Sequence, residues 1–262
     1  MSVRGAIKGS RSSRRRGSTT FAGFRIEREL GRGGMGTVYL ARELELDRDV
    51  ALKVIREDFA DDEEFRERFR AESRTAASID HPRVVSVFGT GERDGLLYVA
   101  MRYVPGPDLQ RLLTSRGHLA PERAADLIAQ VGEGLDAVHA AGLVHRDVKP
   151  ANVIVSDDRA GAADADAFLT DFGLARSVAA STGLIATGQL IGSVDYMAPE
   201  QIEGRRVDAR TDVYALGCVL FQAITGEVPF PEPETSAKMW SHLNAPPHRP
   251  ALTRAPRLFW IR

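Results

Sequence analysis

The sequence lacks the features that mark secreted, membrane-spanning and nucleic-acid-binding chains. Its 262 residues contain one cysteine, Cys218, so an internal disulfide framework is excluded and a reducing, cytoplasmic setting is expected. No apolar run is long enough to span a bilayer, and no apolar segment of the signal-peptide type stands near the start. The formal net charge of −1 gives the chain as a whole no electrostatic reason to bind nucleic acid.

The first 20 residues differ in composition from the rest. They carry basic side chains and no acid among many Ser, Gly and Thr, which is typical of a disordered basic tail. Such a tail either binds an anionic surface, such as a membrane or nucleic acid, or remains a solvated arm without a specific role. In the chain as a whole, a hydrophobic content of 43% is enough for a substantial core, so one large or two small domains are expected.

The stretch 145–152, His-Arg-Asp-Val-Lys-Pro-Ala-Asn, places an acid, a base and an amide on a predicted loop. An apolar approach precedes it, and the β-branched run 153–155 follows it as a strand. On such a loop, Asp147 can accept a proton from a hydroxyl group and Lys149 can neutralise a phosphate in transfer. Asn152 can offer its side-chain oxygen to a metal ion. The spacing therefore favours phosphoryl transfer.

A glycine-rich segment lies between two predicted strands. The residues that follow it, 37–40, are β-branched and aromatic and predict a strand, whereas a dinucleotide-binding fold would begin a helix there. The glycines therefore close a hairpin, whose backbone N–H groups can approach phosphates because few side chains intervene. A purely structural turn is the alternative interpretation. The segment consists of Gly31, Arg32, Gly33, Gly34, Met35 and Gly36.

A lysine interrupts the next predicted apolar strand. Alternation places Ala51, Lys53 and Ile55 on one face, and a lysine on a core-facing side needs a carboxylate partner or an anionic ligand. The predicted helix over 61–79 carries apolar residues at spacings of three and four, and Glu72 falls on that face. The sequence thus predicts a Lys53–Glu72 ion pair. Alternatively, Glu72 lies at the edge of the face among neighbouring arginines.

Taken in order, these motifs resemble the protein kinase family, most closely the bacterial eukaryote-like (Hanks-type) serine/threonine kinases. Asp-Phe-Gly at 171–173 and Ala-Pro-Glu at 198–200 complete the set, and the resemblance covers about residues 24–245. It implies an α+β, two-lobed fold, with a small five-stranded antiparallel N-lobe carrying one helix (the family's helix C) and a mainly helical C-lobe. Two strands of that N-lobe are expected near 84–88 and 96–101.

The resemblance implies a serine/threonine protein kinase, which transfers the γ-phosphate of ATP to protein hydroxyls with Mg²⁺, or Mn²⁺ in its place. Asp147 would be the base and Lys149 its electrostatic partner, while Asn152 and Asp171 would hold the metal. The partners implied are proteins that bear Ser or Thr.

The resemblance also implies a nucleotide site. Lys53 would hold the α and β phosphates, Glu72 would orient Lys53, and the glycine segment 31–36 would cover the phosphates. Backbone groups of Arg102 and Val104 would bond the edge of adenine. Three apolar residues would enclose its ring and a fourth would be the gatekeeper, although each is also an ordinary core residue; they are Val38, Ala51, Ile154 and, as gatekeeper, Met101.

The segment between the two later motifs is rich in Ser and Thr and resembles an activation loop. Because Arg146 precedes Asp147, the resemblance implies that this arginine clamps a phosphorylated residue of the loop. Asp212 resembles the aspartate that bonds the backbone of the catalytic loop; the alternative is that it caps a helix. The available loop hydroxyls are those of Ser177, Ser181, Thr182 and Thr187.

After Phe230, the family builds further helices for which this sequence shows no pattern, so the resemblance implies an incomplete C-lobe. The helix predicted over 212–224 is apolar on nearly every side, and we therefore expect an exposed apolar patch and self-association. A second hypothesis is therefore that the chain is a damaged kinase that serves as a nucleotide-binding or scaffold module.

The expected domain boundaries are 1–20 for the tail and 21–262 for the kinase domain. Within the kinase domain, 21–101 is the N-lobe, 102–107 the hinge, 108–245 the incomplete C-lobe and 246–262 an atypical tail.

Overall fold

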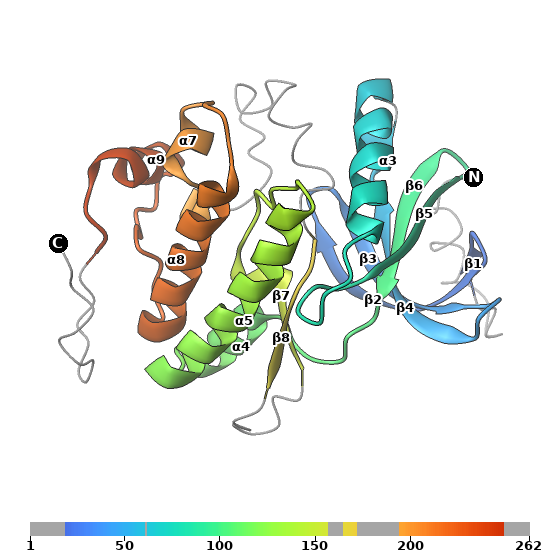
Figure 1. The fold of residues 1–262 in the computed structure, drawn as a ribbon, viewed down its shortest axis with the longest axis horizontal. Helices are drawn as coiled ribbons and strands as arrows, with labels where there is room; N and C mark the ends of the chain where they lie inside the picture. The colour runs from blue at the N-terminus through green and yellow to red at the C-terminus, as the bar shows by residue number, and fades with distance from the viewer. Residues whose placement is uncertain (1–18, 61, 157–164, 172–193, 249–262) are drawn as a thin grey trace. The chain divides into compact units, whose positions relative to one another are not determined.

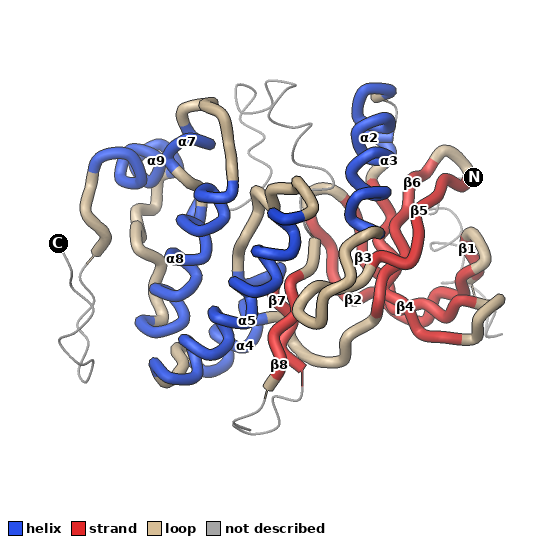
Figure 2. The backbone as a smooth tube through the Cα atoms, viewed as in Figure 1, coloured by secondary structure: helices blue, strands red, loops and turns tan. Residues whose placement is uncertain are grey.

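The computed structural model describes residues 19–60, 62–156, 165–171 and 194–248 (Figure 1). These residues form two compact units, and the division between the units falls between Val104 and Pro105. The first unit is built mainly of strands and the second mainly of helices (Figure 2). The predicted α+β class of fold is thus confirmed.

The first unit is organised around one antiparallel sheet of six strands in the order β1-β2-β3-β4-β6-β5. The sequence predicted five strands. The additional strand is the two-residue β1, which pairs with β2, so the folded part begins before residue 21. The strands are β1 (Thr20–Phe21), β2 (Phe24–Gly33), β3 (Gly36–Glu43), β4 (Arg48–Ile55), β5 (Val87–Arg93) and β6 (Leu96–Arg102).

Strand β5 lies later in the chain than the sequence suggested. Residues 89–91 were expected to leave the sheet, but they continue β5, and the turn is confined to Asp94 and Gly95. The ring of Tyr98 covers the strand at Gly91, where an added Cβ would lie 2.4 Å from the Tyr98 hydroxyl. Glycine is therefore needed here for close packing, and it does not end the strand.

One face of the sheet carries the main aromatic cluster. The ring of Tyr98 packs edge-on against Phe21 and Phe24, with centroids 5.7 and 5.8 Å apart. Val50, Leu52 and Val54 of β4 belong to the same buried cluster. Strand alternation therefore turns Ala51 and Lys53 to the opposite face, where both are only partly buried. This second face also carries core residues, since Val99, which pairs with Lys53, and Ile55 are buried.

The predicted helix over 61–79 corresponds to α3 (Glu63–Ala77), and a short helix, α2 (Glu57–Ala60), precedes it. Asp62 begins α3 as its N-cap, since its side chain accepts a hydrogen bond from the Phe65 N–H at 3.2 Å. Phe65 and Phe69 are buried and stacked, and α3 packs against β5. Glu72 is partly buried.

The second unit is built around two long helices, α5 and α8, which run side by side (Figure 1). Their facing sides bury apolar residues, including Val131 and Val138 of α5 and Val219 of α8. The hairpin β7–β8 packs against α5. The described elements are α4 (Leu109–Arg116), α5 (Pro121–Ala140), η2 (Pro150–Asn152), β7 (Val153–Ser156), β8 (Asp166–Leu169), η3 (Val194–Tyr196), α7 (Pro199–Ile202), α8 (Ala209–Thr225) and α9 (Thr235–Asn244).

Helix α8 buries several of its apolar residues and exposes one of them. Val213 is 62% exposed, but Ala215, Cys218 and Val219 are buried. Burial raises the pKa of the Cys218 thiol to about 12, as expected for an unreactive packing residue.

A further helix, α9, follows Phe230 and places His242 against the Phe230 ring, with centroids 4.5 Å apart. Within the described ranges, no helix is long and apolar enough to cross a membrane.

Two glycines of the second unit differ in what surrounds them, which makes a test of its packing. Gly106 and Gly142 have φ values of 140° and 79°, but an added Cβ would lie 2.2 Å from the Val155 carbonyl oxygen at Gly106 and near no atom at Gly142. We expect Gly142→Ala to cost about 1–2 kcal/mol from backbone strain alone. Gly106→Ala should cost more than about 3 kcal/mol, because overpacking against β7 is added to the strain. Urea unfolding of the two variants measures this, and equal losses would contradict it.

Candidate active site

Asp212 fixes the backbone of the loop that carries Asp147. Its carboxylate is fully buried, with Oδ2 accepting a hydrogen bond from the His145 N–H at 2.8 Å and Oδ1 accepting one from the Arg146 N–H at 2.7 Å. The Nε2 atom of His139 lies 2.7 Å from Oδ2. One side chain of α8 thus holds two successive peptide groups directly before Asp147.

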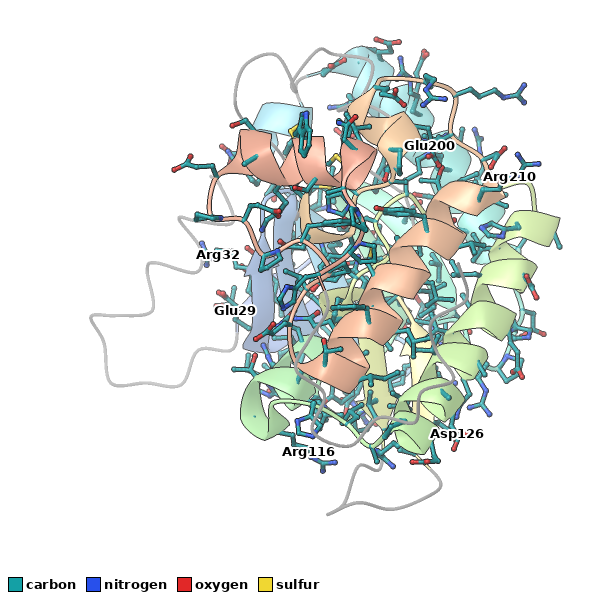
Figure 3. The ribbon with its side chains drawn as sticks, turned by 90° about the vertical axis from the view of Figure 1, so that its left-hand side faces the viewer. Glu29, Arg32, Arg116, Asp126, Glu200 and Arg210 are labelled. Atoms are coloured by element: carbon teal, nitrogen blue, oxygen red, sulfur yellow. The ribbon has the colours of Figure 1, made fainter. Side chains whose placement is uncertain are left out.

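The helix cap that was the alternative role for Asp212 belongs to another residue. Asp208 is the N-cap of α8, and its side chain accepts a hydrogen bond from the Arg210 N–H at 2.9 Å. Arg210 itself extends outward from the start of α8 (Figure 3). The interpretation of Asp212 as the holder of the loop is therefore confirmed.

Arg146 adopts a conformation that few residues other than glycine adopt. Its φ is 64°, in the left-handed region, where a non-glycine residue costs on the order of 1–3 kcal/mol. The N–H of Arg146 is held by Asp212, and its carbonyl accepts a hydrogen bond from the Gln201 Nε2 atom at 3.0 Å. Both neighbouring peptide groups are thus fixed by side chains from other elements.

His145 supports the loop from inside the unit. Its Nδ1 atom lies 3.3 Å from the Asp147 N–H, which can only donate, so Nε2 carries the proton and donates to the Thr170 carbonyl at 3.1 Å. The imidazole is completely buried, and burial lowers its pKa. The ring is therefore a neutral link between the Asp147 loop and the residue that precedes Asp171.

Two side chains converge on the Asp147 carboxylate. The Lys149 ammonium donates to Oδ2 at 2.7 Å, and the Asn152 amide nitrogen lies 3.2 Å from the same oxygen. The same amide nitrogen also donates to the Asp147 carbonyl at 2.7 Å. Asp147 and Lys149 are both partly buried, so their attraction is less screened than at an open surface. The sequence placed these three residues on one loop, and the structure brings their functional groups together.

The predicted metal ligands follow each other across the β7–β8 hairpin. Val153 pairs with Leu169, and just beyond this pair the Thr170 N–H donates to the Asn152 carbonyl at 3.0 Å. Asp171 comes next, with a φ of 59°. Since the Asn152 amide nitrogen is turned to Asp147, the amide oxygen remains as a potential ligand. An amide oxygen and a carboxylate suit Mg²⁺, so this pair fits that ion.

In the first unit, the glycine segment forms the β2–β3 hairpin, with Gly33 opposite Gly36. Gly36 is required for packing, because an added Cβ would lie 2.2 Å from the Val54 carbonyl oxygen. At Gly31 and Gly33, by contrast, an added Cβ would meet no atom within 4 Å. No close neighbour within the described chain requires glycine at these two positions, and both leave the backbone open to a ligand.

Arg56, which sequence reasoning missed, supports the tip of this hairpin. Its backbone N–H donates to the Met35 carbonyl at 3.0 Å, and its side chain donates to the Gly34 carbonyl at 3.2 Å. Arg32 turns its side chain to Glu29 at 2.9 Å (Figure 3), so only its backbone remains for the predicted phosphate contact. The sequence did not single out Arg56, because an arginine that follows an apolar strand carries no distinguishing signal.

The strand register groups most of the predicted nucleotide residues on one face of the sheet. Val38 pairs with Lys53, and Ala51 pairs with Met101. Because directly paired residues share a face and alternate positions do too, all four lie on the face opposite the aromatic cluster. The sequence of a single strand could not show that these four residues share a face, because the register between strands decides it.

The remaining predicted site residues are placed individually. The N–H of Arg102 donates to the Ser86 carbonyl at 2.9 Å, so this N–H is not the group for the predicted contact with adenine. Val104 is buried, and Ile154 is a partly buried member of β7. The pairing of Lys53 with Glu72 stays a prediction. The loop hydroxyls, from Ser177 to Thr187, lie outside the described residues.

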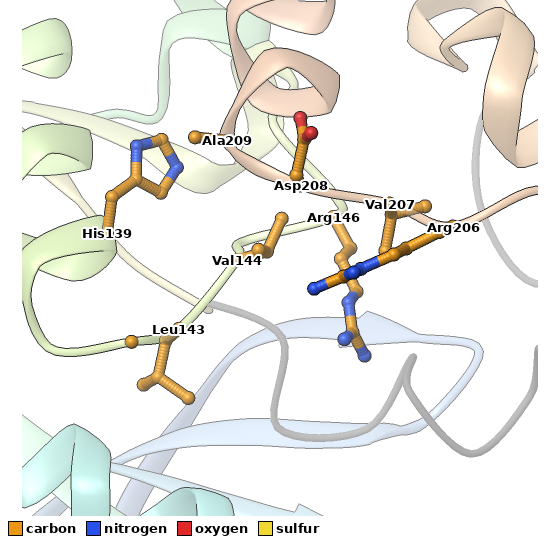
Figure 4. A pocket seen from close by; sticks show the side chains of 9 residues that line it. His139, Leu143, Val144, Arg146, Arg206, Val207, Asp208 and Ala209 are labelled. Atoms are coloured by element: carbon orange, nitrogen blue, oxygen red, sulfur yellow. The ribbon is translucent and has the colours of Figure 1, made fainter.

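A cavity of about 470 Å³ opens beside the catalytic loop in the second unit (Figure 4). Arg146 and Arg206 contribute guanidinium groups to it, and Asp208 contributes a carboxylate at the start of α8. Arg206 was not singled out from the sequence, because it lies among three arginines and no motif marks it. The other lining residues are His139, Gly142, Leu143, Val144, Val207 and Ala209.

Glu200 of the Ala-Pro-Glu motif lies in α7 (Figure 3). Its carboxylate accepts a hydrogen bond from the Thr211 hydroxyl of α8 at 2.5 Å. The sequence predicted that Glu200 would lack the arginine that the family supplies from a later helix, unless a tail residue such as Arg249 or Arg254 replaced it. Thr211 is therefore a described partner for Glu200, and it ties α7 to the start of α8.

The strand-built unit with its glycine hairpin and the helical unit with its His-Arg-Asp loop define the protein kinase class of fold. The protein kinase domain family matches residues 24–254, and the chain belongs to that family. This confirms the resemblance on which the sequence interpretation was based.

Relatives of this chain include mycobacterial serine/threonine-protein kinases. PknJ of Mycobacterium tuberculosis is 43% identical over 231 residues, which are 87% of this chain and 38% of PknJ. PknB of Mycobacterium leprae is 42% identical over 226 residues, 85% of this chain and 35% of PknB. The chain thus spans less than half the length of these curated relatives. The Mycobacterium tuberculosis PknI kinase domain is a structural neighbour, with a TM-score of 0.66 and 33% identity over 87% of this chain and 90% of that one.

The burial of His145 predicts its behaviour with pH. Since its pKa is lower in the folded state, the unfolded chain binds more protons below about pH 6.5, and this residue's contribution to stability is lost as the pH falls. We expect ring NMR signals of the neutral Nε2–H tautomer at pH 6 and a lower free energy of unfolding at pH 5.5 than at pH 7.5. A His145 imidazolium in the folded protein at pH 6 would overturn this account.

Proposed function

We propose that this chain transfers the γ-phosphate of ATP to serine or threonine hydroxyls of protein substrates. The observation that carries the proposal is the Asp147 carboxylate, which is held on a fixed loop and contacted by Lys149 and Asn152. In this position Asp147 accepts the proton of the attacking hydroxyl, and Lys149 stabilises the negative charge on the group in transfer. The names of the relatives, all serine/threonine-protein kinases, support the choice of acceptor.

The second unit also supplies the proposed metal ligands. Asn152 offers its amide oxygen and Asp171 its carboxylate, which suits Mg²⁺ and also Mn²⁺. When bound, the ion would neutralise phosphate charge and orient the phosphates. No group of three or more His, Cys, Asp or Glu residues suited to a metal occurs in the described ranges. That finding agrees with a site completed by phosphate oxygens and water, as Mg²⁺ commonly uses.

The first unit supplies the proposed nucleotide contacts. The backbone around Gly31 and Gly33 is open to phosphates, and Lys53 brings a positive charge to the same face as Val38 and Ala51. The two apolar side chains suit an adenine ring, and Met101 borders them as gatekeeper. We propose Glu72 as the partner that orients Lys53. Residues 102–107 are the proposed hinge, and the cytoplasm, where ATP and Mg²⁺ are available, is the proposed location.

The enzyme is favoured over the scaffold hypothesis by a specific observation. The left-handed conformation of Arg146 and the buried Asp212 carboxylate cost free energy, and both serve to fix Asp147. A module that only bound nucleotide would not need this arrangement.

Replacement of the proposed base tests the activity. Asp147→Asn should lower the rate of phosphate transfer from ATP by a factor on the order of 10² to 10⁴, because the general base is lost. Asp136→Asn removes the same charge from an exposed position of α5 and is the matched control, with an expected rate near that of the parent. Lys53→Met should also abolish transfer with the fold retained. Equal ³²P incorporation by the parent and Asp147→Asn would refute the proposed base.

We propose in addition that phosphorylation of the loop after Asp171 regulates the enzyme. Arg146 and Arg206 both line the cavity beside the catalytic loop, and their positive charges favour a phosphoryl group there. A phosphate bound there would gain charge-assisted hydrogen bonds and order its own segment.

After incubation with ATP and Mg²⁺, at least one of Ser177, Ser181, Thr182 and Thr187 should carry a phosphate. Peptide mass spectrometry identifies the site, and the inactive Asp147→Asn protein, incubated alone, is the control that should remain unmodified. An active preparation with an unmodified loop would rule out this mode of control.

A further inference from the structure

The peptide group that joins Arg146 to Asp147 is held from both sides. Its carbonyl oxygen accepts a hydrogen bond from the Gln201 Nε2 atom at 3.0 Å, and its N–H donates to the His145 Nδ1 atom at 3.3 Å. The Asp147 Cα follows this peptide directly, so rotation of the peptide would displace the carboxylate. Gln201 is the one contact in this set that comes from α7.

Gln201 is itself fixed in orientation. Its Oε1 atom accepts a hydrogen bond from the Ala198 N–H at 3.1 Å, at the start of α7. A backbone N–H only donates and a backbone carbonyl only accepts, so the two contacts determine which end of the amide faces Arg146. The side chain is partly buried, and α7 is tied to α8 by the hydrogen bond from Thr211 to Glu200.

The strain at Arg146 gives this contact its importance. A residue at φ 64° relaxes if a neighbouring peptide can rotate, and the structure opposes this with one bond on each side of the residue. Asp212 holds the N–H, and Gln201 holds the carbonyl. Loss of the Gln201 donor would leave a partly buried carbonyl without this partner and free the peptide to turn.

We propose that Gln201 is a positioning residue for Asp147. It holds the Arg146–Asp147 peptide in the orientation that directs the Asp147 carboxylate to Lys149 and Asn152, without contacting the reacting groups. The consequence for catalysis rests on the proposed phosphotransfer. Because Gln201 belongs to α7, the placement of the base depends on the chain segment that follows the loop hydroxyls.

The chain offers a matched control in Gln130 of α5. Its Oε1 atom accepts a hydrogen bond from the Ala167 N–H at 2.8 Å, and its Nε2 atom donates to the Ala165 carbonyl at 3.3 Å. Gln130 thus bridges two backbone groups as Gln201 does, but it holds β8 and not the catalytic loop. Gln201→Glu and Gln130→Glu each replace the donor by an acceptor of the same size.

Steady-state kinetics and urea unfolding of both variants distinguish misplacement of Asp147 from a general loss of stability. We expect Gln201→Glu to lower kcat about 10- to 100-fold, because a displacement on the order of 1 Å at the reacting groups costs about 10². The KM for ATP should change less than about twofold. Gln130→Glu should keep kcat within about twofold of the parent at a similar loss of stability. Gln201→Lys restores a donor of similar reach and should recover part of kcat, whereas Gln201→Met should not.

Hydrogen exchange of the backbone amides gives a measurement that does not depend on activity. In Gln201→Glu and Gln201→Met, the Asp147 amide should exchange at least tenfold faster than in the parent, while the Gln130→Glu variant leaves it unchanged. If exchange at Asp147 and kcat both match the parent in either folded Gln201 variant, the positioning role is wrong. If the parent transfers no phosphate, the proposed function fails, and the exchange rates still decide whether Gln201 holds the peptide.

Discussion

The structure of the catalytic loop depends on one buried carboxylate, that of Asp212. Its two oxygens accept hydrogen bonds from the N–H groups of His145 and Arg146, and the buried charge is stabilised because these donors and His139 surround it. Asp212 thereby holds one side of Arg146, whose φ is 64°, and Gln201 holds the other side. Asp147 follows Arg146 directly, so its placement depends on both contacts.

In both units, a hydrogen bond within the chain fixes the orientation of a polar group at the candidate site. In the helical unit, the Asn152 amide nitrogen donates to Asp147, so the amide oxygen is the atom offered to the proposed metal ion. In the sheet unit, Arg56 donates to the carbonyls of Gly34 and Met35, at the tip of the hairpin proposed to cover the phosphates. In both places, hydrogen bonds within the chain fix the orientation of the groups proposed to meet a ligand.

Errors in the sequence interpretation arose where distant segments decide the packing. Glycines at 89 and 91 suggested a turn, but Tyr98 from the neighbouring strand lies over Gly91 and makes it a strand residue. Local patterns carry no information on which remote side chain covers a given face.

The sequence by itself determined the family, the order of the motifs, and the grouping of Asp147, Lys149 and Asn152, because residues two to five apart on one loop must lie close together. It also indicated Asp212, although it left open whether that residue caps a helix or holds the loop. Only the tertiary structure decided between these roles and revealed Gln201, Arg56 and Arg206 as contributors. The contacts of Arg56 and Gln201 join residues 22 and 55 positions apart, and no periodicity or spacing in the sequence specifies such pairs.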